Sequence, residues 1–180
     1  TGLVLIDQRA AHERILYERL LAQATSGTSR RQPLLMPVTL EMPPARSALL
    51  NRQLDRFAEL GFHIEAFGSN TFLIRSAPAQ VAGSDLAKLI DDMLGELEEG
   101  GSPRRRVDAE RLAAVASRCA VPTAKTLSET ERNRLLADLA RTDMPYTAPD
   151  GRPVMVNIPN ADIARRFGKD RNTQRTAPTE

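Results

Sequence analysis

The pattern of apolar positions changes at a single carboxylate near the start of the chain. Residues 3–6 form an unbroken apolar run, which is typical of a short buried strand. The segment after Asp7 has apolar side chains every three or four positions, which predicts an amphipathic helix. Its apolar positions are Ala11, Ile15, Leu16 and Leu20. The sequence therefore predicts a strand that delivers Asp7 to the start of a helix.

The middle of the chain has patterns of a helix, a hairpin and a second helix. Residues 32–43 contain several prolines and are expected to be extended, because proline restricts its own φ and disfavours the α region before it. A helix with one apolar face follows and stops at Gly61. Alternating residues 62–66 and 71–75 flank a Gly-Ser-Asn turn, which indicates a β-hairpin. Ser84 is then expected to cap the second helix.

The C-terminal part repeats the alternation of helices and strands. Residues 108–120 predict a helix rich in small side chains, and Ser128 and Glu131 fit a capping box that opens another helix. Residues 154–158 predict a strand, with a short helix after it. Residues 169–180 are polar and are expected to form a tail.

Strands at both ends of the chain bracket a long middle section, which indicates the domain organisation. We expect a mixed α+β fold with two subdomains. Residues 1–26 and 119–168 form one lobe from both chain ends, and residues 27–118 form a lobe inserted between them. The polar tail at residues 169–180 belongs to neither.

Composition narrows the class of protein. The 180 residues are 41% hydrophobic and 27% charged, which is ordinary for a globular protein, and no apolar run approaches the roughly 20 residues of a membrane span. A cytoplasmic location is expected. With 25 Lys and Arg against 23 Asp and Glu, attraction to DNA through this domain is expected to be weak. Cys119, the one cysteine, cannot form an internal disulfide.

Four carboxylates are the candidate chemical groups: Asp7, Glu13, Glu18 and Asp150. Carboxylate oxygens suit Mg²⁺ or Mn²⁺. Positions 9 and 13 share one helix face, and a His and a Glu at that spacing would form a pair of metal ligands. Position 9 is Arg, however, so an Arg9–Glu13 ion pair is expected where a cation would sit.

The segment Asp7-Gln8-Arg9-Ala10-Ala11-His12-Glu13, continuing to Glu18, resembles the C-terminal domain of the mismatch-repair protein MutL. Members with endonuclease activity carry D-Q-H-A-x-x-E-x-x-x-x-E there, and only the His is replaced, by Arg9. Three further segments match in the family's order: residues 32–37, 60–68 and 148–153.

The resemblance implies a degenerate endonuclease site. The family's Ala-Cys-Arg and Cys-Pro-His-Gly-Arg-Pro segments read Ala116-Ser117-Arg118 and Ala148-Pro149-Asp150-Gly151-Arg152-Pro153 here. Zinc prefers the thiolate and imidazole ligands that are lost, so neither catalysis nor a bound metal is expected. The vestigial positions are Asp7, Arg9, Glu13, Glu18, Ser117, Ala148 and Asp150. The alternative is weak Mn²⁺-dependent DNA nicking by the carboxylates alone, with Asp7, Glu13 and Asp150 as the metal ligands.

Residues 32–37 fit Q-x-L-x-x-P, which in MutL relatives resembles a motif that docks the replication sliding clamp. Gln32 would fix the segment, Leu34 and Leu35 would be apolar anchors, and Pro37 would limit the entropy lost on docking. The alternative is that the segment simply begins a strand, with Leu34 facing the core.

The functional hypotheses follow from this resemblance. The first is a dimerisation and partner-docking domain of a MutL-type matchmaker, with a dimerisation subdomain from both chain ends and an external regulatory subdomain between them. Its partners would be a second copy, the sliding clamp and other mismatch-repair proteins. No cofactor is expected in this domain, because the ATPase of such a protein lies in its N-terminal region. The other hypotheses are the carboxylate-only nicking enzyme and a generic α/β scaffold that does not self-associate.

Overall fold

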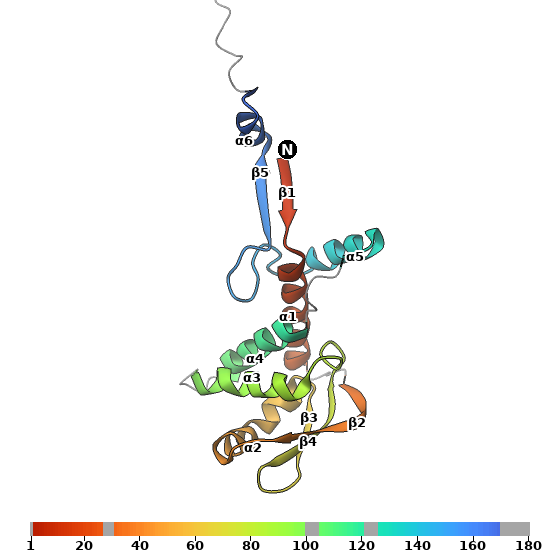
Figure 1. Ribbon diagram of the computed structural model, residues 1–180, viewed down its shortest axis with the longest axis vertical. Coiled ribbons are helices and arrows are strands. Elements are labelled where there is room, and N and C mark those ends of the chain that lie inside the picture. Colours follow the sequence, from red (N-terminus) through yellow and green to blue (C-terminus); the bar gives the residue numbers. More distant parts are fainter. Residues whose placement is uncertain (1, 27–30, 100–104, 121–125, 170–180) are drawn as a thin grey trace, which may run out of the picture.

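The computed structural model describes residues 2–26, 31–99, 105–120 and 126–169, so nearly all of the expected tail lies outside the described residues. Helices and two small antiparallel sheets make a mixed α+β fold, as expected (Figure 1). The elements follow in the order β1 (Gly2–Ile6), α1 (Gln8–Ser26), β2 (Arg31–Glu41), α2 (Pro44–Glu59), β3 (His63–Ala66), β4 (Thr71–Pro78), α3 (Leu86–Glu99), α4 (Arg105–Ala120), α5 (Glu129–Leu139), β5 (Met155–Pro159) and α6 (Asn160–Arg166).

The larger part of the molecule is built on a three-stranded sheet in the order β2-β4-β3. The predicted helix and hairpin are both confirmed: α2 ends before Gly61, and the β3–β4 turn contains Gly68. Both glycines have positive φ, 100° and 123°, a conformation that other residues adopt only with strain. Phe57 and Phe62 meet edge to face, with ring centroids 5.9 Å apart. They belong to a cluster of buried residues, called here the large core, which has twenty members among the residues that the structure describes.

Helix α3 begins one residue later than expected, which corrects the assignment of its cap. The Oδ1 atom of Asp85 accepts a hydrogen bond from the Lys88 backbone N–H at 3.1 Å, as an N-cap does. The Ser84 hydroxyl instead donates to the carbonyl oxygen of Val81 at 2.7 Å. At α5 the predicted capping box is confirmed, with Ser128 and Glu131 bonded to each other's backbone N–H groups.

A second, much smaller cluster lies where α1 meets α5 and the loop that leads into β5. This small core consists of Ala10, Ala11, Ile15, Leu135, Leu139, Ala148 and Val154. Helix α1 runs from the small core to the large core, to which it contributes Leu20 (Figure 1). It therefore packs in both, whereas the sequence assigned all of it to the lobe formed by the chain ends. The predicted lobe boundaries stay predictions.

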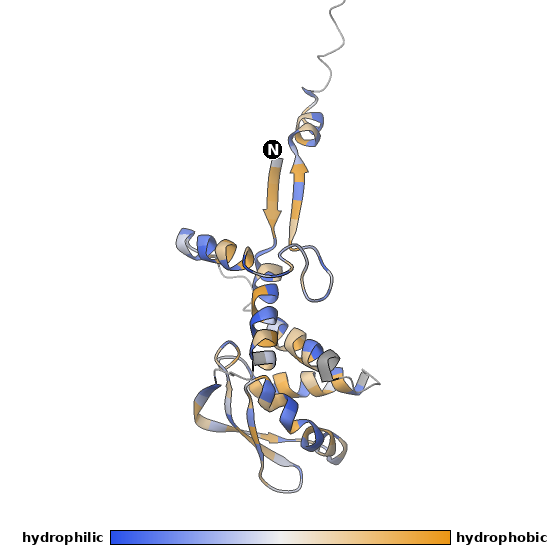
Figure 2. Ribbon diagram, turned by 180° about the vertical axis from the view of Figure 1, so that it is seen from behind, coloured by the Kyte–Doolittle hydropathy of each residue, from blue (hydrophilic) through white to orange (hydrophobic). Residues whose placement is uncertain are grey.

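Strands β1 and β5 pair with each other and, in the described part of the chain, form a two-stranded ribbon that projects from the rest of the molecule (Figures 1 and 2). The expectation that residues 3–6 are buried is wrong for a single copy, because Leu3, Val4 and Leu5 are 49–52% exposed. Opposite residues of an antiparallel pair point to the same face. One face therefore consists of aliphatic side chains only, called here the aliphatic face: Leu3, Leu5, Val156 and Ile158.

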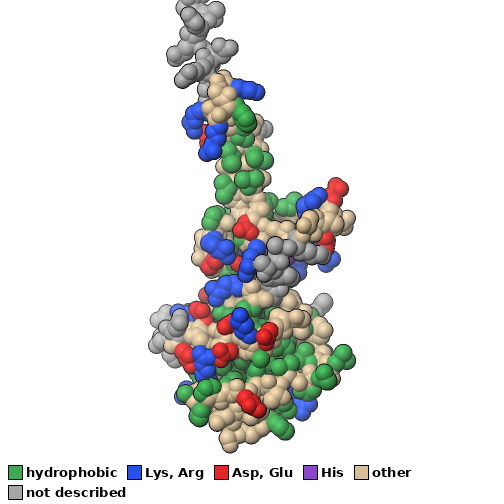
Figure 3. Space-filling view, viewed as in Figure 1, with side chains coloured by type: hydrophobic (Ala, Val, Ile, Leu, Met, Phe, Trp, Pro, Cys, Tyr) green, Lys and Arg blue, Asp and Glu red, His purple; other side chains and the backbone are tan. Residues whose placement is uncertain are grey.

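The other face of the ribbon is covered at its base, where Ile6 and Met155 pack against the small core. Hydrophobic side chains gather on the surface of the projecting ribbon (Figure 3). Among the residues that the structure describes, no helix is both long enough and apolar enough to cross a membrane.

Candidate functional site

Asp7 lies at the junction of β1 and α1, as predicted, and caps the helix. Its Oδ1 atom accepts hydrogen bonds from the backbone N–H groups of Arg9 and Ala10 at 2.8 and 3.1 Å. Its own backbone N–H donates to the carbonyl oxygen of Val154 at 2.9 Å. The carboxylate therefore caps α1, and the backbone N–H of the same residue holds the start of α1 next to the start of β5.

Glu13 is 1% exposed, and each of its carboxylate oxygens accepts from a guanidinium. Arg9 Nε donates to Oε1 at 2.9 Å, which confirms the predicted ion pair. Arg152 Nη2 donates to Oε2 at 2.9 Å, from a position 139 residues further along the chain. No spacing rule predicts this second pair, although Arg152 lies in one of the segments that match the family.

Arg152 also holds Asp150, so that one guanidinium joins two carboxylates. Arg152 Nε donates to Asp150 Oδ2 at 2.6 Å, and the Arg152 backbone N–H donates to Oδ1 at 3.1 Å. Burial acts to raise the pKa of the Asp150 carboxyl, but the hydrogen bonds and charge of Arg152 outweigh it and leave that pKa below its ordinary value. Gly151, with φ of 87°, allows the tight turn between them.

Glu18 is one turn further along α1 from this group and holds a different part of the loop. Its two oxygens accept from the backbone N–H groups of Asp143 and Met144, at 2.8 and 3.2 Å. Arg14, which lies over the Tyr17 ring at 5.2 Å, donates to the carbonyl oxygen of Thr147 at 2.5 Å. The polar side of α1 therefore fastens the loop that leads into β5.

The two positions that replace the family's cysteines are both buried. The Ser117 hydroxyl donates to the carbonyl oxygen of Ala114 in its own helix at 2.9 Å. Ala148 is 1% exposed and belongs to the small core. A hydroxyl bonded within its helix and a methyl group offer no thiolate to a metal ion.

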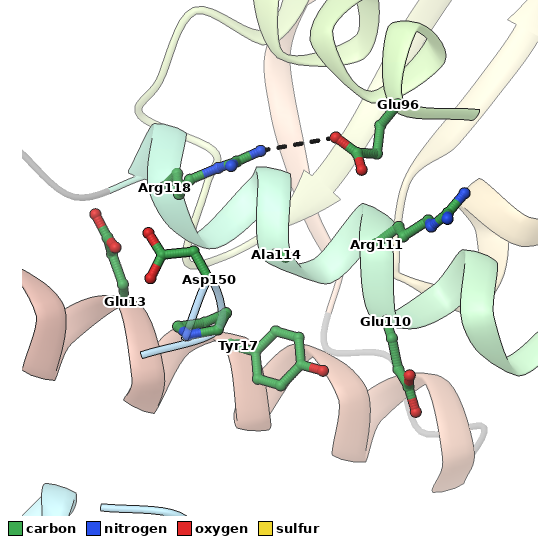
Figure 4. Close-up of a pocket in the computed structure, with 9 residues that line it drawn as sticks. Glu13, Tyr17, Glu96, Glu110, Arg111, Ala114, Arg118 and Asp150 are labelled. Atoms are coloured by element: carbon green, nitrogen blue, oxygen red, sulfur yellow. Dashed lines mark ion pairs between the residues drawn. The ribbon is translucent and has the colours of Figure 1, made fainter. Parts of the chain in front are cut away.

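Glu13 and Asp150 lie beside each other at a cleft of about 360 Å³ between α1, the loop at residues 149–150, α3 and α4 (Figure 4). On the opposite side, Arg118 Nη2 lies 3.9 Å from Glu96 Oε2.

Asp7 and Glu18 do not line this cleft. Across the described ranges, no group of three or more His, Cys, Asp or Glu side chains is arranged to hold a metal ion. The alternative ligands Asp7, Glu13 and Asp150 are therefore not brought together as a set.

Residues 32–37, called here the docking segment, lie in the edge strand β2 at an irregularity. Pro33 pairs with Ser76 and Val38 with Ile74, so residues 34–37 bulge away from β4 opposite a single residue. Leu35 is fully exposed and Met36 is 80% exposed, while Leu34 packs partly against the large core. The segment thus combines one apolar side chain turned inward with two turned outward.

Comparisons with known proteins place the chain in one family. Residues 1–127 match the family model described as the MutL C terminal dimerisation domain. The chain is 40% identical over 170 residues to the DNA mismatch repair protein MutL of Opitutus terrae, and 41% identical over 169 residues to that of Methanothrix thermoacetophila. Each alignment covers 93% of this chain, but only 27% and 30% of the relatives.

The MutL protein of Phenylobacterium zucineum is 36% identical over 171 residues, again across 93% of this chain and 27% of the relative. The chain thus spans little more than a quarter of the length of the curated relatives it matches. With a matched segment that covers more than half of its residues, this chain belongs to the family of MutL C-terminal dimerisation domains.

Proposed function

We propose that this domain joins two copies of a MutL-type protein through the ribbon. The observation that carries the proposal is the aliphatic face, which has no polar side chain and which no layer of the described residues covers within one copy. A two-stranded ribbon is marginally stable in water by itself, and an exposed apolar face of this kind marks an interaction site. A second copy that packs its own aliphatic face on the first, related by two-fold symmetry, would stabilise both ribbons and cover both apolar faces.

Sedimentation equilibrium of the 180-residue chain at micromolar concentration tests this assembly. A dimer is the expected result, because burial of several half-exposed aliphatic side chains in each copy is favourable by about 25 cal/mol per Å². A species that stays monomeric up to about 100 μM, where even a weak contact of this kind would be populated, would rule the proposal out.

The dimer would serve a matchmaker in mismatch repair. The relatives are named DNA mismatch repair proteins, and most of their length lies outside the region that this chain matches. In this role the domain holds two ATP-operated N-terminal arms together and presents surfaces to other repair proteins. Detection of the mismatch would then be passed to a separate step of nicking or excision.

The endonuclease site is proposed to be vestigial, and the donor set supports this. Both oxygens of Glu13 are occupied by guanidiniums, Asp7 caps α1, and Ser117 is bonded within its own helix. These groups do not fit a divalent cation without rearrangement.

Two measurements test the vestigial site. The purified domain is expected to hold no stoichiometric zinc by elemental analysis and to leave supercoiled DNA intact with Mn²⁺. The combined changes Arg9→His, Ser117→Cys, Ala148→Cys and Asp150→His are expected to restore zinc binding. Nicking by the unmodified domain that disappears in Glu13→Ala would establish the carboxylate-only enzyme instead.

A second function, docking of the sliding clamp, is favoured by the bulge in β2. The docking segment lies in β2, an outer strand of the sheet. Edge strands tolerate prolines such as Pro33 and Pro37, because no strand needs hydrogen bonds from the free side. Leu35 and Met36 already face outward, so docking needs no unfolding of the strand. The contact would be small and weak.

Binding of purified clamp to the immobilised domain tests the docking. Gln32→Ala with Leu35→Ala is expected to weaken binding about tenfold or more, since apolar anchors dominate small interfaces. Phe67→Ala, which removes an exposed apolar side chain at the β3–β4 turn, is the matched control. Equal binding by both variants and the unmodified domain would exclude docking by this segment.

A further inference from the structure

Glu13 is the one acidic side chain of the candidate site that is buried, and it is held from two directions. Arg9 reaches it from the preceding turn of α1, and Arg152 reaches it from the loop that enters β5. Burial of a carboxylate is costly unless its charge and both oxygens are compensated. Two charge-assisted hydrogen bonds at 2.9 Å supply that compensation here.

Opposite charges alternate around Glu13. The Arg9 and Arg152 guanidiniums are positive, the Glu13 and Asp150 carboxylates pair with them directly, and the charge of Asp7 also acts on Arg152. Both arginine side chains are half exposed, so they stay hydrated on the outer side while the carboxylate is enclosed. The donors of a guanidinium also point in fixed directions because the group is planar and rigid, so it orients its carboxylate partners.

The loop held by Arg152 determines where β5 begins. The Ala148 backbone N–H donates to the Arg152 carbonyl oxygen at 2.8 Å and closes the turn. Two residues later, the Val154 backbone N–H donates to the Tyr146 carbonyl oxygen at 2.8 Å, and the Val154 carbonyl oxygen accepts from Asp7. A contact that fixes Arg152 on α1 therefore also fixes the start of the ribbon.

We propose that Arg9, Glu13 and Arg152 form a guanidinium lock, in which two arginines hold the buried Glu13 carboxylate, one at each oxygen, and tie the loop at residues 148–153 to α1. Arg9 and Glu13, which stand at two of the vestigial positions, thus join Arg152 in a metal-free cross-link that positions β5. The lock rests on the proposed absence of a working metal site, but it does not require the domain to dimerise.

Amide hydrogen exchange at fixed protein concentration tests the lock locally. Glu13→Gln keeps the shape of the side chain and removes its charge, which takes away the carboxylate partner of Arg9 and one of the two carboxylate partners of Arg152. The Ala148 and Val154 amides are expected to exchange roughly tenfold faster or more, because exchange reports local opening. The Phe72 and Ile74 amides, in β4 of the large core, are expected to keep their rates.

A double-mutant cycle with Arg152→Gln tests whether the two residues act as a pair. Each single change is expected to lower the thermal midpoint by roughly 5 °C or more, and the double change by clearly less than the sum. Asp162→Asn, which breaks an exposed pair with Arg165 in α6, is the matched control and is expected to change the midpoint little. If Glu13→Gln does not fold, Arg152→Lys, which keeps the charge but not the fork, serves in its place.

Three results would overturn the lock. The first is unchanged exchange of the Ala148 and Val154 amides in Glu13→Gln or, in its place, Arg152→Lys. The second is full additivity in the cycle. The third is a higher thermal midpoint with Mn²⁺ or Zn²⁺ in the unmodified domain but not in Glu13→Gln, which would mean that Glu13 holds a cation. A monomeric but exchange-protected domain would contradict only the proposed dimer.

Discussion

The large core and the small core differ in how much of their stability lies within one copy of the chain. Twenty buried residues make the large core, including Phe57, Phe62 and Phe72, and helices and a three-stranded sheet enclose them. Seven buried residues make the small core, and three of them are alanines. Much of the aliphatic surface next to the small core faces outward on the ribbon instead.

The carboxylates of ion pairs are more exposed around the large core than around the small core. In the large-core region, Arg46 pairs with Asp91 and Arg75 with Glu65 on the exposed surface, where such pairs contribute little. Around the small core, Glu13 is enclosed, and Glu18 and Arg14 bond to backbone groups of the loop. The small core thus depends on polar cross-links and, in our account, on a second copy.

The largest effect is expected in the large core. Phe57→Ala removes a fully buried ring and is expected to lower the free energy of unfolding by about 3–5 kcal/mol, through lost burial and the cavity left behind. Phe67→Ala, in an exposed position, is expected to change it by less than about 0.5 kcal/mol. Urea denaturation measures both. Similar losses would mean that the large core does not carry the stability assigned to it.

A substitution in the aliphatic face of the ribbon is expected to weaken dimerisation more than it weakens folding. Leu5→Lys places a charge in the middle of the aliphatic face and is expected to weaken dimerisation by roughly 30-fold or more, about 2–3 kcal/mol. Thr39→Lys, on the exposed side of β2, is the control with the same added charge. Sedimentation equilibrium across a dilution series gives both dissociation constants. An unchanged constant for Leu5→Lys would move the interface elsewhere.

Helix caps offer a matched pair in the two regions. Ser128→Ala removes the cap of α5 and Asp85→Ala that of α3, and each is expected to cost about 1 kcal/mol. Ser84→Ala should cost less, because that hydroxyl does not cap α3. Thermal unfolding of the three variants checks this order. A Ser84→Ala loss greater than that of Asp85→Ala would restore the cap predicted from the sequence.

The smallest effect is expected at acid pH. Because Arg152 holds the pKa of Asp150 below its ordinary value, the folded protein binds this proton less readily than the unfolded chain. The resulting stability is present above the ordinary Asp pKa of about 4 and is lost as the pH falls through the lowered value. Asp150→Asn should remove this contribution, which is below about 1 kcal/mol for a surface pair. The urea midpoint of the variant should therefore depend slightly less on pH between pH 5 and 3 than that of the unmodified domain.

Local patterns were enough to predict most elements of the fold. The hairpin, the helix that ends at Gly61 and the capping box at Ser128 each depend on residues close in sequence, and the structure has all three. The Arg9–Glu13 pair was predictable for the same reason, since positions four apart share a helix face. Asp85 was missed because two adjacent residues could both cap α3.

Contacts between distant segments could not be predicted in this way. Arg152 reaches Glu13 only because the loop before β5 folds back on α1, and nothing near position 152 indicates it. The apolar run at residues 3–6 looks the same whether its cover comes from its own chain or from a second copy, so the pattern alone does not predict how much of it is exposed in one copy. The bulge at residues 34–37 likewise depends on the register with β4.

Isotope-filtered NMR on a dimer of one methyl-labelled and one unlabelled copy tests the central claim most directly. Our account predicts intermolecular contacts among the methyl groups of the aliphatic face, Leu3, Leu5, Val156 and Ile158. Intermolecular contacts confined to the large-core region, with none from these four side chains, would contradict it.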